Sequence, residues 1–270
     1  MIVTKDFPNK QFSNKDELFA ELRANKHKLK TAKTLSIKEA DAFYYVPSTT
    51  TNKDANKANT SENDVKKISV KFVVNSCGWY DSHGDVHVKG CWNKTANENK
   101  RFLHLQEHVN KFDHVISDNV IPSVEEIEIK GKKVDALVAT STIERKDNPF
   151  MFDKYANGKV KEHSVGMQYI WDKLYLAIDS NHEDDKEEKA NWDKYIAQVI
   201  NQDEVNEKGY FWAVAEAKAI EGSAVVMGSN SQTPTMQVTE IKEVEPSNHS
   251  NEDKEPSNDT LIKAINNLKI

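Results

Sequence analysis

Residues 161–169 read KEHSVGMQY and place Ser164 between a histidine and a glycine, where the chain enters an apolar strand. A serine hydroxyl becomes a good nucleophile only when a base takes its proton and hydrogen-bond donors hold the oxyanion that forms. Gly166 would let a backbone pass close to a substrate without a side chain in the way. Most Ser-x-Gly triplets are plain strand ends or turns. The stretch therefore indicates chemistry only if a base and an orienting group occur elsewhere in the chain.

The composition indicates a folded core with polar segments outside it. Of the 270 residues, 37% are hydrophobic and 30% are charged, which is too polar for one compact globule of this length. The net charge is -6, and the 37 Lys and Arg residues form no basic stripe, so nucleic acid is not an expected partner. Cys77 and Cys91 are expected to be reduced, buried side chains, which favours a cytosolic setting.

Membrane association is not expected either. No apolar run in the sequence is long enough to cross a bilayer, and the start, MIVTKDFPNK, lacks the apolar core of a signal peptide.

Changes in polarity along the chain predict its organisation. The first part is an N-terminal helical extension, with Leu18, Phe19 and Leu22 on one helix face. Polar linkers separate it and a C-terminal amphipathic helix from the central domain. A stretch inside that domain has helical periodicity and is interpreted as an insertion. The boundaries are 1–46 for the extension, 47–67 for the first linker, 68–245 for the domain, 172–209 for the insertion, and 246–270 for the second linker and terminal helix.

Alternation of apolar and polar residues predicts strands in the central domain. Residues 68–74 alternate like a strand with one buried face, and Gly131-Lys132 marks a hairpin turn before a second strand from Val134 to Ile143. Asn148-Pro149 has the cap and first-turn proline of a helix start. We therefore expect an α+β fold that is mostly antiparallel, with helices around the core.

The segment HLQEH, residues 104–108, has two interpretations. As a helix it fits the H-x-x-E-H pattern of zinc peptidases, in which His104 and His108 would bind the metal and the glutamate would act as base. As a strand it puts both histidines on one face, and one of them could serve as the base for Ser164. No downstream glutamate in a clear helical ligand motif completes a zinc site, so we predict neither metal nor cofactor.

Glu221 lies among small and apolar residues, where a carboxylate needs a partner because burying a lone charge is costly. A neutral, hydrogen-bonded glutamate is the plain interpretation. The functional one is a group that orients the histidine and stabilises the imidazolium, as the third member of a catalytic triad does. Glu216 and a second histidine are the competitors for this role.

The order of these features resembles the prohead (capsid-maturation) proteases of tailed phages, whose fold is similar to that of herpesvirus assemblin. The resemblance covers about residues 68 to 243 and rests on the ordered set rather than on any single motif. The segments that carry it are Asp81 to Val86, Gly90-Cys91-Trp92, Leu105 to His108, Tyr155 to Gly158, Ser164-Val165-Gly166, Ala219 to Ser223 and Ser229 to Pro234. Cys91-Trp92 stands where the family has Ala-Phe, and Val109 stands where the family has an aspartate.

The resemblance implies a β-barrel-like core and a serine endopeptidase with Ser164 as nucleophile, His108 as general base and Glu221 as orienting acid. We expect the oxyanion donors to be backbone amides near Val165 and Gly166. The implied substrates are the scaffold protein, the amino-terminal segment of the major capsid protein and the chain itself, cut inside an assembling procapsid in the host cytoplasm. Self-association is a further expectation. Two alternatives stay open: a zinc metallopeptidase that uses His104 and His108, and a non-catalytic capsid-assembly protein on the same fold.

Overall fold

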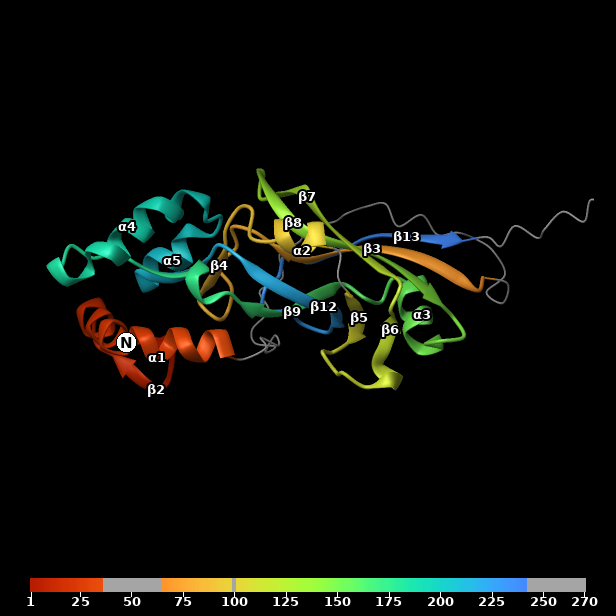
Figure 1. The fold of residues 1–270 in the computed structure, drawn as a ribbon, viewed down its shortest axis with the longest axis horizontal. Helices are drawn as coiled ribbons and strands as arrows, with labels where there is room; N and C mark the ends of the chain where they lie inside the picture. The colour runs from red at the N-terminus through yellow and green to blue at the C-terminus, as the bar shows by residue number, and fades with distance from the viewer. Residues whose placement is uncertain (36–64, 99–100, 242–270) are drawn as a thin grey trace, which may run out of the picture.

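A computed structural model describes residues 1–35, 65–98 and 101–241 (Figure 1). The fold is α+β, as the sequence predicts. Several predicted segments lie outside the described residues. They are the end of the N-terminal extension, most of the first linker, and the second linker with the C-terminal amphipathic helix. Within those residues, no helix has the length and apolar character needed to cross a bilayer.

Two four-stranded sheets form the centre of the molecule. The first is antiparallel, in the order β13-β3-β8-β7, and the second is mixed, in the order β6-β5-β12-β9. The strands of the first sheet are β3 (Lys67–Ser76), β7 (Val120–Ile129), β8 (Lys132–Glu144) and β13 (Thr235–Ile241). Those of the second are β5 (Leu103–Gln106), β6 (Val115–Ser117), β9 (Glu162–Tyr169) and β12 (Ala217–Val225).

The two sheets pack face to face, and they do not close into the barrel that was expected. Phe72 of β3 stacks on the imidazoles of His104 and His163 in the opposite sheet, with ring centroids 4.6 and 4.2 Å apart. Closure would need a continuous ladder between the sheets. At the β9 edge, the contacts with the segment before β13 include one bridge, between Glu162 and Pro234, and the hydrogen bonds of His163 with Thr233. Among the described strands, neither β9 nor β6 pairs with a strand of the first sheet, which is the physical reason why the barrel interpretation was wrong.

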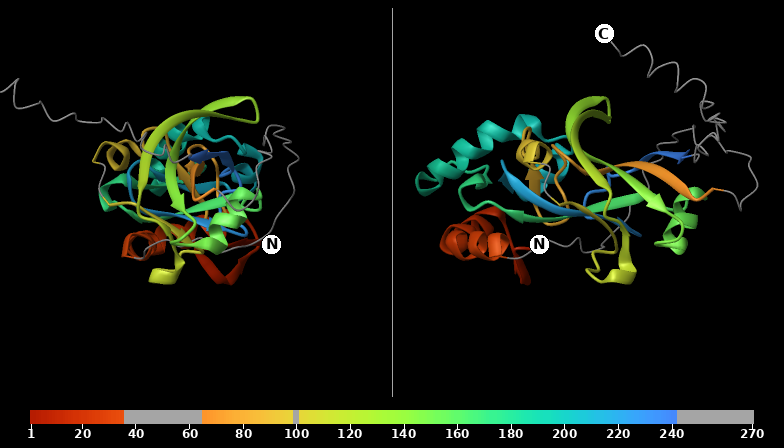
Figure 2. Two further views of the ribbon diagram at one scale, coloured as in Figure 1. Left: turned by 90° about the vertical axis from the view of Figure 1, so that its right-hand side faces the viewer. Right: turned by 45° about the vertical axis from the view of Figure 1, so that its right-hand side comes forward.

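A third sheet and two helices lie at one end of the molecule (Figures 1 and 2). Its order is β10-β11-β4, with β10 antiparallel and β4 parallel to β11. The strands are β4 (Asp85–His87), β10 (Leu174–Ile178) and β11 (Tyr210–Val214), and the helices nearby are α4 (Lys186–Tyr195) and α5 (Gln202–Lys208). The predicted helical insertion at 172–209 therefore begins with a strand, because Leu174, Leu176 and Ile178 alternate into the core.

Local sequence signals account for several element boundaries. The β7–β8 hairpin turns at Lys130-Gly131, where both residues have positive φ angles of 48° and 75°. Helix α3 (Pro149–Ala156) begins at Asn148, whose side chain accepts a hydrogen bond from the Met151 amide. A short helix, α2 (Asn93–Glu98), follows the turn after β4.

The N-terminal part is a hairpin followed by a helix. Strands β1 (Ile2–Thr4) and β2 (Phe7–Phe12) pair with each other, and α1 (Lys15–Leu35) follows them. Asn14 caps the helix by accepting a hydrogen bond from the Glu17 amide. The buried residues Phe7, Phe12, Leu18, Phe19 and Leu22 belong to the same hydrophobic cluster as the central sheets.

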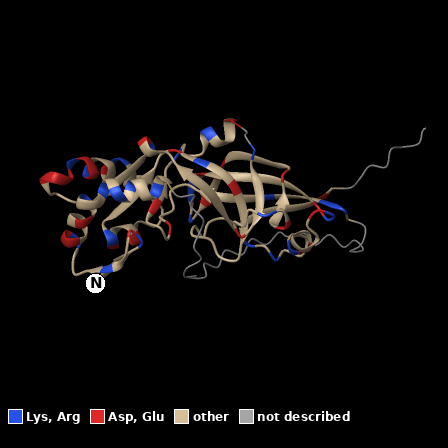
Figure 3. Cartoon of the chain, turned by 60° about the horizontal axis from the view of Figure 1, so that its bottom comes forward, with Lys and Arg blue, Asp and Glu red and all other residues tan. Residues whose placement is uncertain are grey.

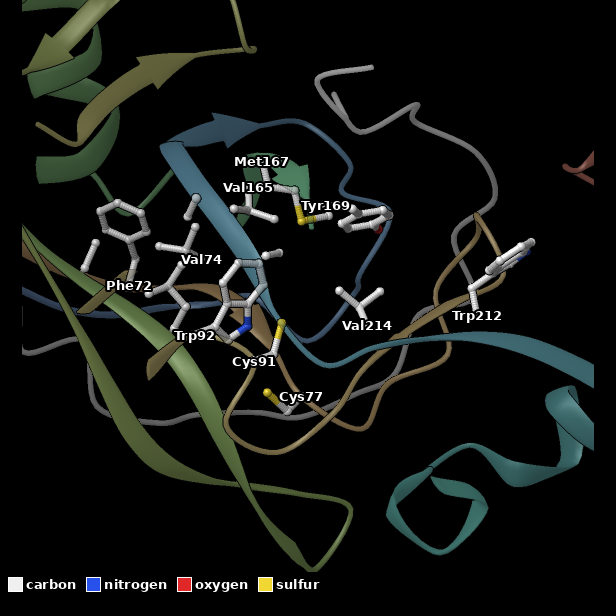
Figure 4. Packing of buried hydrophobic residues seen from close by; sticks show 14 of the residues in the cluster. Phe72, Val74, Cys77, Cys91, Trp92, Val165, Met167, Tyr169, Trp212 and Val214 are labelled. Carbon is white, nitrogen blue, oxygen red and sulfur yellow. The ribbon is translucent and has the colours of Figure 1, made fainter. Parts of the chain in front are cut away.

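Figure 4 shows the middle of that cluster, where the buried cysteines lie beside Trp92. Cys77 and Cys91 are free thiols, as the sequence predicts. Val165, Met167 and Tyr169 of β9 point into this core (Figure 4). Because side chains alternate along a strand, Ser164 and Gly166 point to the opposite face of β9.

Candidate active site

Glu221 binds the imidazole of His108. Its Oε1 atom lies 2.6 Å from Nδ1 of His108, although 113 residues of sequence separate them. Both side chains are nearly buried, with exposed fractions of 8% and 5%. A carboxylate at Nδ1 requires the proton on that nitrogen, which leaves Nε2 as the atom able to accept a proton from another group. This is the arrangement of base and orienting acid in a triad.

Ser223 holds both members of this pair. Its hydroxyl donates to Oε2 of Glu221 at 2.6 Å and accepts the backbone N–H of His108 at 3.0 Å. Glu221 therefore has both carboxylate oxygens bound by the site. Ser223 was not among the predicted site residues. The spacing of two residues on a strand, which puts Ser223 on the face of Glu221, was the signal that could have identified it.

The turn that carries His108 has an uncommon backbone. Glu107 and His108 have φ angles of 52° and 59°, which is the left-handed region that residues other than glycine seldom adopt. Three consecutive amides hold the turn: Glu107 N–H donates to the Ala224 carbonyl, His108 N–H to Ser223, and Val109 N–H to the Gln106 carbonyl. Such conformations persist where the surroundings fix them, and they cluster at functional sites.

Ser164 lies on the same sheet face as the Glu221–His108 pair. Strand β9 runs antiparallel to β12, with Ser164 opposite Ser223 and Gly166 opposite Glu221. Directly opposed residues point to one face, and their Cβ atoms are about 5 Å apart. Ser164 therefore stands across from the hydroxyl that binds both His108 and Glu221. Folding brings Glu221 into contact with His108 and places Ser164 on the same face of the sheet.

Gly166 serves a different purpose from the one expected. A Cβ atom at this position would lie 2.0 Å from Oε1 of Glu221. The carboxylate of Glu221 thus lies over β9 at Gly166, the one residue of that strand that has no side chain, and contacts His108 there. The glycine of the Ser-x-Gly triplet gives room to the orienting acid, and the close approach is to a protein side chain rather than to a substrate.

The two expected oxyanion donors face in different directions. The amide and carbonyl of His163 both bind Thr233, on the side of β9 away from β12. Backbone groups alternate along a strand, so the N–H of Val165 points to that same edge, whereas the N–H of Gly166 points toward β12. Of the two, only Val165 directs its amide to the edge where β9 lacks a neighbouring strand in its sheet.

Glu216, the competitor for the third position, is remote from this group. It pairs with Lys94 at 3.3 Å, near the start of β12 and at the far side of the β-bulge from Glu221. Glu221 is the carboxylate in contact with the base.

His104 is a buried structural residue and does not face His108. Residues 103–106 are a strand, so the helical spacing that the zinc pattern requires is absent. The imidazole of His104 lies 3.0 Å from the Ser141 hydroxyl and 2.8 Å from the Tyr155 hydroxyl. Among the residues that the structure describes, no three His, Cys, Asp or Glu side chains are grouped to hold a metal ion. The zinc interpretation of HLQEH therefore lacks its geometry.

His163, next to Ser164, belongs to the same buried chain of hydrogen bonds. Its Nδ1 donates to the Thr233 carbonyl at 3.0 Å, so the neutral ring accepts at Nε2 from the Tyr155 hydroxyl at 2.8 Å. Tyr155 then accepts from Nε2 of His104, and Nδ1 of His104 accepts from Ser141. Burial lowers the pKa of His163 to about 4 and holds the pKa of His104 well below its usual value. Both rings are neutral supports beneath the site.

His114 is remote from this network and pairs with the neighbouring Asp113 at the surface. It forms part of neither the site nor the buried network.

Comparisons of this chain with family models, curated proteins and solved structures found no match. The assignment of a function therefore depends on the geometry of Ser164, His108, Glu221 and Ser223.

Proposed function

We propose that the chain is a serine endopeptidase of the prohead-protease type. The observation that carries the proposal is the contact of Glu221 with His108, on the face of the sheet where Ser164 stands opposite Ser223. A carboxylate, an imidazole and a serine from three separate strands or turns are the parts of a nucleophilic triad.

In the proposed reaction, Ser164 attacks a peptide carbonyl while Nε2 of His108 takes its proton. His108 then gives that proton to the leaving amine, and water releases the acyl group from Ser164 by the reverse use of the same base. Glu221 holds the ring in one orientation and stabilises its charged form. The N–H of Val165 is the proposed donor to the oxyanion.

The proposed substrates are the scaffold protein, the amino-terminal segment of the major capsid protein and the chain itself, inside an assembling procapsid. Support for them is the ordered resemblance of residues 68–243 to the prohead proteases. Residues 47–64 and 246–260, where the self-cleavage sites are proposed, lie outside the described residues.

Mass spectrometry of the expressed chain tests the proposal. Wild-type protein, alone and with scaffold, should yield new termini, and Ser164→Ala should yield none, a loss of at least about 1000-fold in rate. Ser69→Ala, a serine change on β3 in the other sheet, is the matched control and should cleave like wild type. Intact substrate with folded wild-type protein would instead support a non-catalytic assembly protein.

A further inference from the structure

Residues 1–35, here called the N-terminal unit, are built into the interior of the protein. Phe7, Phe12, Leu18, Phe19 and Leu22 are each exposed by less than a tenth and share the main hydrophobic cluster. At Gly209 the fit is close: a Cβ atom there would lie 2.8 Å from the ring of Phe19. The unit therefore fills space that would otherwise be an apolar cavity.

A buried ion pair joins the N-terminal unit to β4. Nζ of Lys33 lies 2.6 Å from Oδ1 of Asp85, and the two side chains are 6% and 0% exposed. The same ammonium donates to the carbonyl of His83 at 3.3 Å. The other carboxylate oxygen of Asp85 accepts from the hydroxyl of Tyr169, the last residue of β9. The cation that balances Asp85 thus comes from the N-terminal unit.

The N-terminal unit also places an aspartate, Asp6, beside Lys33 and strand β11. Asp6 lies 3.5 Å from Lys33 and accepts hydrogen bonds from the Tyr210 hydroxyl and the Trp212 ring nitrogen of β11, at 3.0 and 3.1 Å. Removing the unit would leave Asp85 without its ammonium and two aromatic donors without their acceptor. Leaving a charge buried without its partner is strongly unfavourable.

A second set of ion pairs joins α1 to the segment before β11. Arg23 binds Asp185 at 2.6 Å, and Lys26 binds Glu187 at 2.9 Å and also reaches Glu188. Figure 3 shows basic and acidic residues side by side at this end of the molecule. The carboxylates of Asp185 and Glu188 are buried, whereas Arg23, Lys26 and Glu187 are partly or fully exposed, so salt screens these pairs only in part.

We propose that the N-terminal unit stays bound as a non-covalent subunit when the chain is cut between residues 36 and 64. Cleavage in that segment, by this protein or by another protease, would then convert one chain into a two-chain complex without release of the unit. The inference does not depend on the proposed proteolytic activity, because it rests on the buried cluster and the shared core.

The test uses the full chain with Ser164→Ala, so that no self-cleavage interferes. A recognition sequence for a site-specific protease is inserted after Asn52, and the chain is cut until a denaturing gel shows no full-length protein. Gel filtration and native mass spectrometry should then find both pieces in one complex, at low salt and at about 1 M NaCl. A separate peak for the N-terminal piece at either salt concentration would overturn the proposal.

Lys33→Met tests the buried ion pair within the same design. It keeps an apolar side chain but leaves Asp85 and Asp6 without their cation, so the unit should dissociate at least about 10-fold faster after cutting. Lys28→Met, an exposed lysine on the same helix, is the matched control and should behave like the parent. Equal dissociation rates for both variants would show that the ion pair does not hold the unit. If Lys33→Met does not fold, the two salt arms with the parent chain still decide the proposal.

Discussion

At the scale of single residues, the candidate site depends on a glycine, Gly166, which has no side chain. Gly166 is the only glycine of the described chain whose added Cβ would fall on the carboxylate of Glu221, at 2.0 Å from Oε1. Because β9 lies beside β12 at this register, the carboxylate of Glu221 occupies the space over Gly166 and contacts His108 there. The space at residue 166 therefore sets the position of the acid, and through it the tautomer of the base.

Gly166→Ala tests that dependence. The methyl group should push Glu221 away from His108, and kcat should fall by about 100- to 1000-fold, with a loss of about 1–3 kcal/mol of stability from overpacking. Cleavage rates and urea denaturation measure the two effects. Gly131→Ala is the control for activity: its φ of 75° makes an alanine strained, but an added Cβ contacts no neighbouring atom, so the variant should lose stability and keep its activity. Full activity in Gly166→Ala would contradict the role given to Glu221.

Ser223→Ala tests the residue that binds both partners. Without the hydroxyl, Oε2 of Glu221 and the N–H of His108 lose a buried partner, which costs about 1–3 kcal/mol of stability. The left-handed turn at residues 107–108 should lose its fixed geometry, so we expect kcat to fall about 10-fold and KM to stay unchanged. A change in KM alone would show that Ser223 acts on substrate binding instead.

At the scale of elements, alternation and turn residues were sufficient to predict the strands and the hairpin from the sequence. The strand at 68–74 and the helix start at Asn148 are found where these patterns placed them, and the hairpin turns one residue earlier than predicted, at Lys130-Gly131. These local patterns do not predict which distant strands pair with each other. The parallel pairing of β5 with β12, which sets the His108 turn beside Ser223, joins segments more than a hundred residues apart.

The candidate site was predicted only in part, because it too depends on the pairing of distant strands. Ser164, His108 and Glu221 were proposed from an ordered resemblance, and the structure brings them to one face. The purpose of Gly166 and the role of Ser223 follow only from the β9–β12 register, which local sequence patterns do not specify. The tautomers of His104 and His163 likewise depend on partners from α3, β8 and the loop at Thr233.

The buried network that ties β5, β9 and α3 together predicts a loss of stability in acid. The pKa of His163 is about 4 in the fold against an ordinary value of 6.5. The unfolded chain therefore binds a proton at a higher pH than the folded one, and stability is lost as the pH falls from about 6.5 toward 4. His163 alone should account for about 2 kcal/mol between pH 7 and pH 5.

Urea denaturation of wild type and His163→Asn at the two pH values measures this effect. The variant cannot titrate at this position, so its loss between pH 7 and pH 5 should be smaller by that amount. His182→Asn, a change at a histidine whose side chain is 56% exposed, is the control and should keep the wild-type slope. Equal slopes for all the proteins would contradict a buried neutral His163.

At the scale of the whole molecule, the cluster that fixes the N-terminal unit carries more acid than base. Asp81, Asp85 and Asp6 surround Lys33, and Tyr80, Tyr169 and Tyr210 line the same region. Asp81 accepts the backbone N–H groups of His83 and Asp85. Burial, and then the charge of Asp85, raise the pKa of Asp81 to about 7. The folded protein therefore holds a proton on this carboxyl that the unfolded chain has released, and Asp81 destabilises the fold increasingly as the pH rises from about 4 toward 7.

Asp81→Asn should remove this cost, because the amide oxygen can still accept both backbone N–H groups without a charge. The variant should have a higher thermal midpoint than wild type at pH 8, and its advantage should shrink as the pH falls from about 7 toward 4, because the unfolded carboxyl then approaches its ordinary pKa of 3.8. Asp118→Asn, at an exposed aspartate near β6, is the control and should show no such trend.

Because the cluster joins the N-terminal unit to β4 and β11, unfolding should remain one cooperative transition in both proteins. Hydrogen exchange measures whether residues 1–35 unfold separately. An early transition of these residues would show that the cluster does not join the unit to the core.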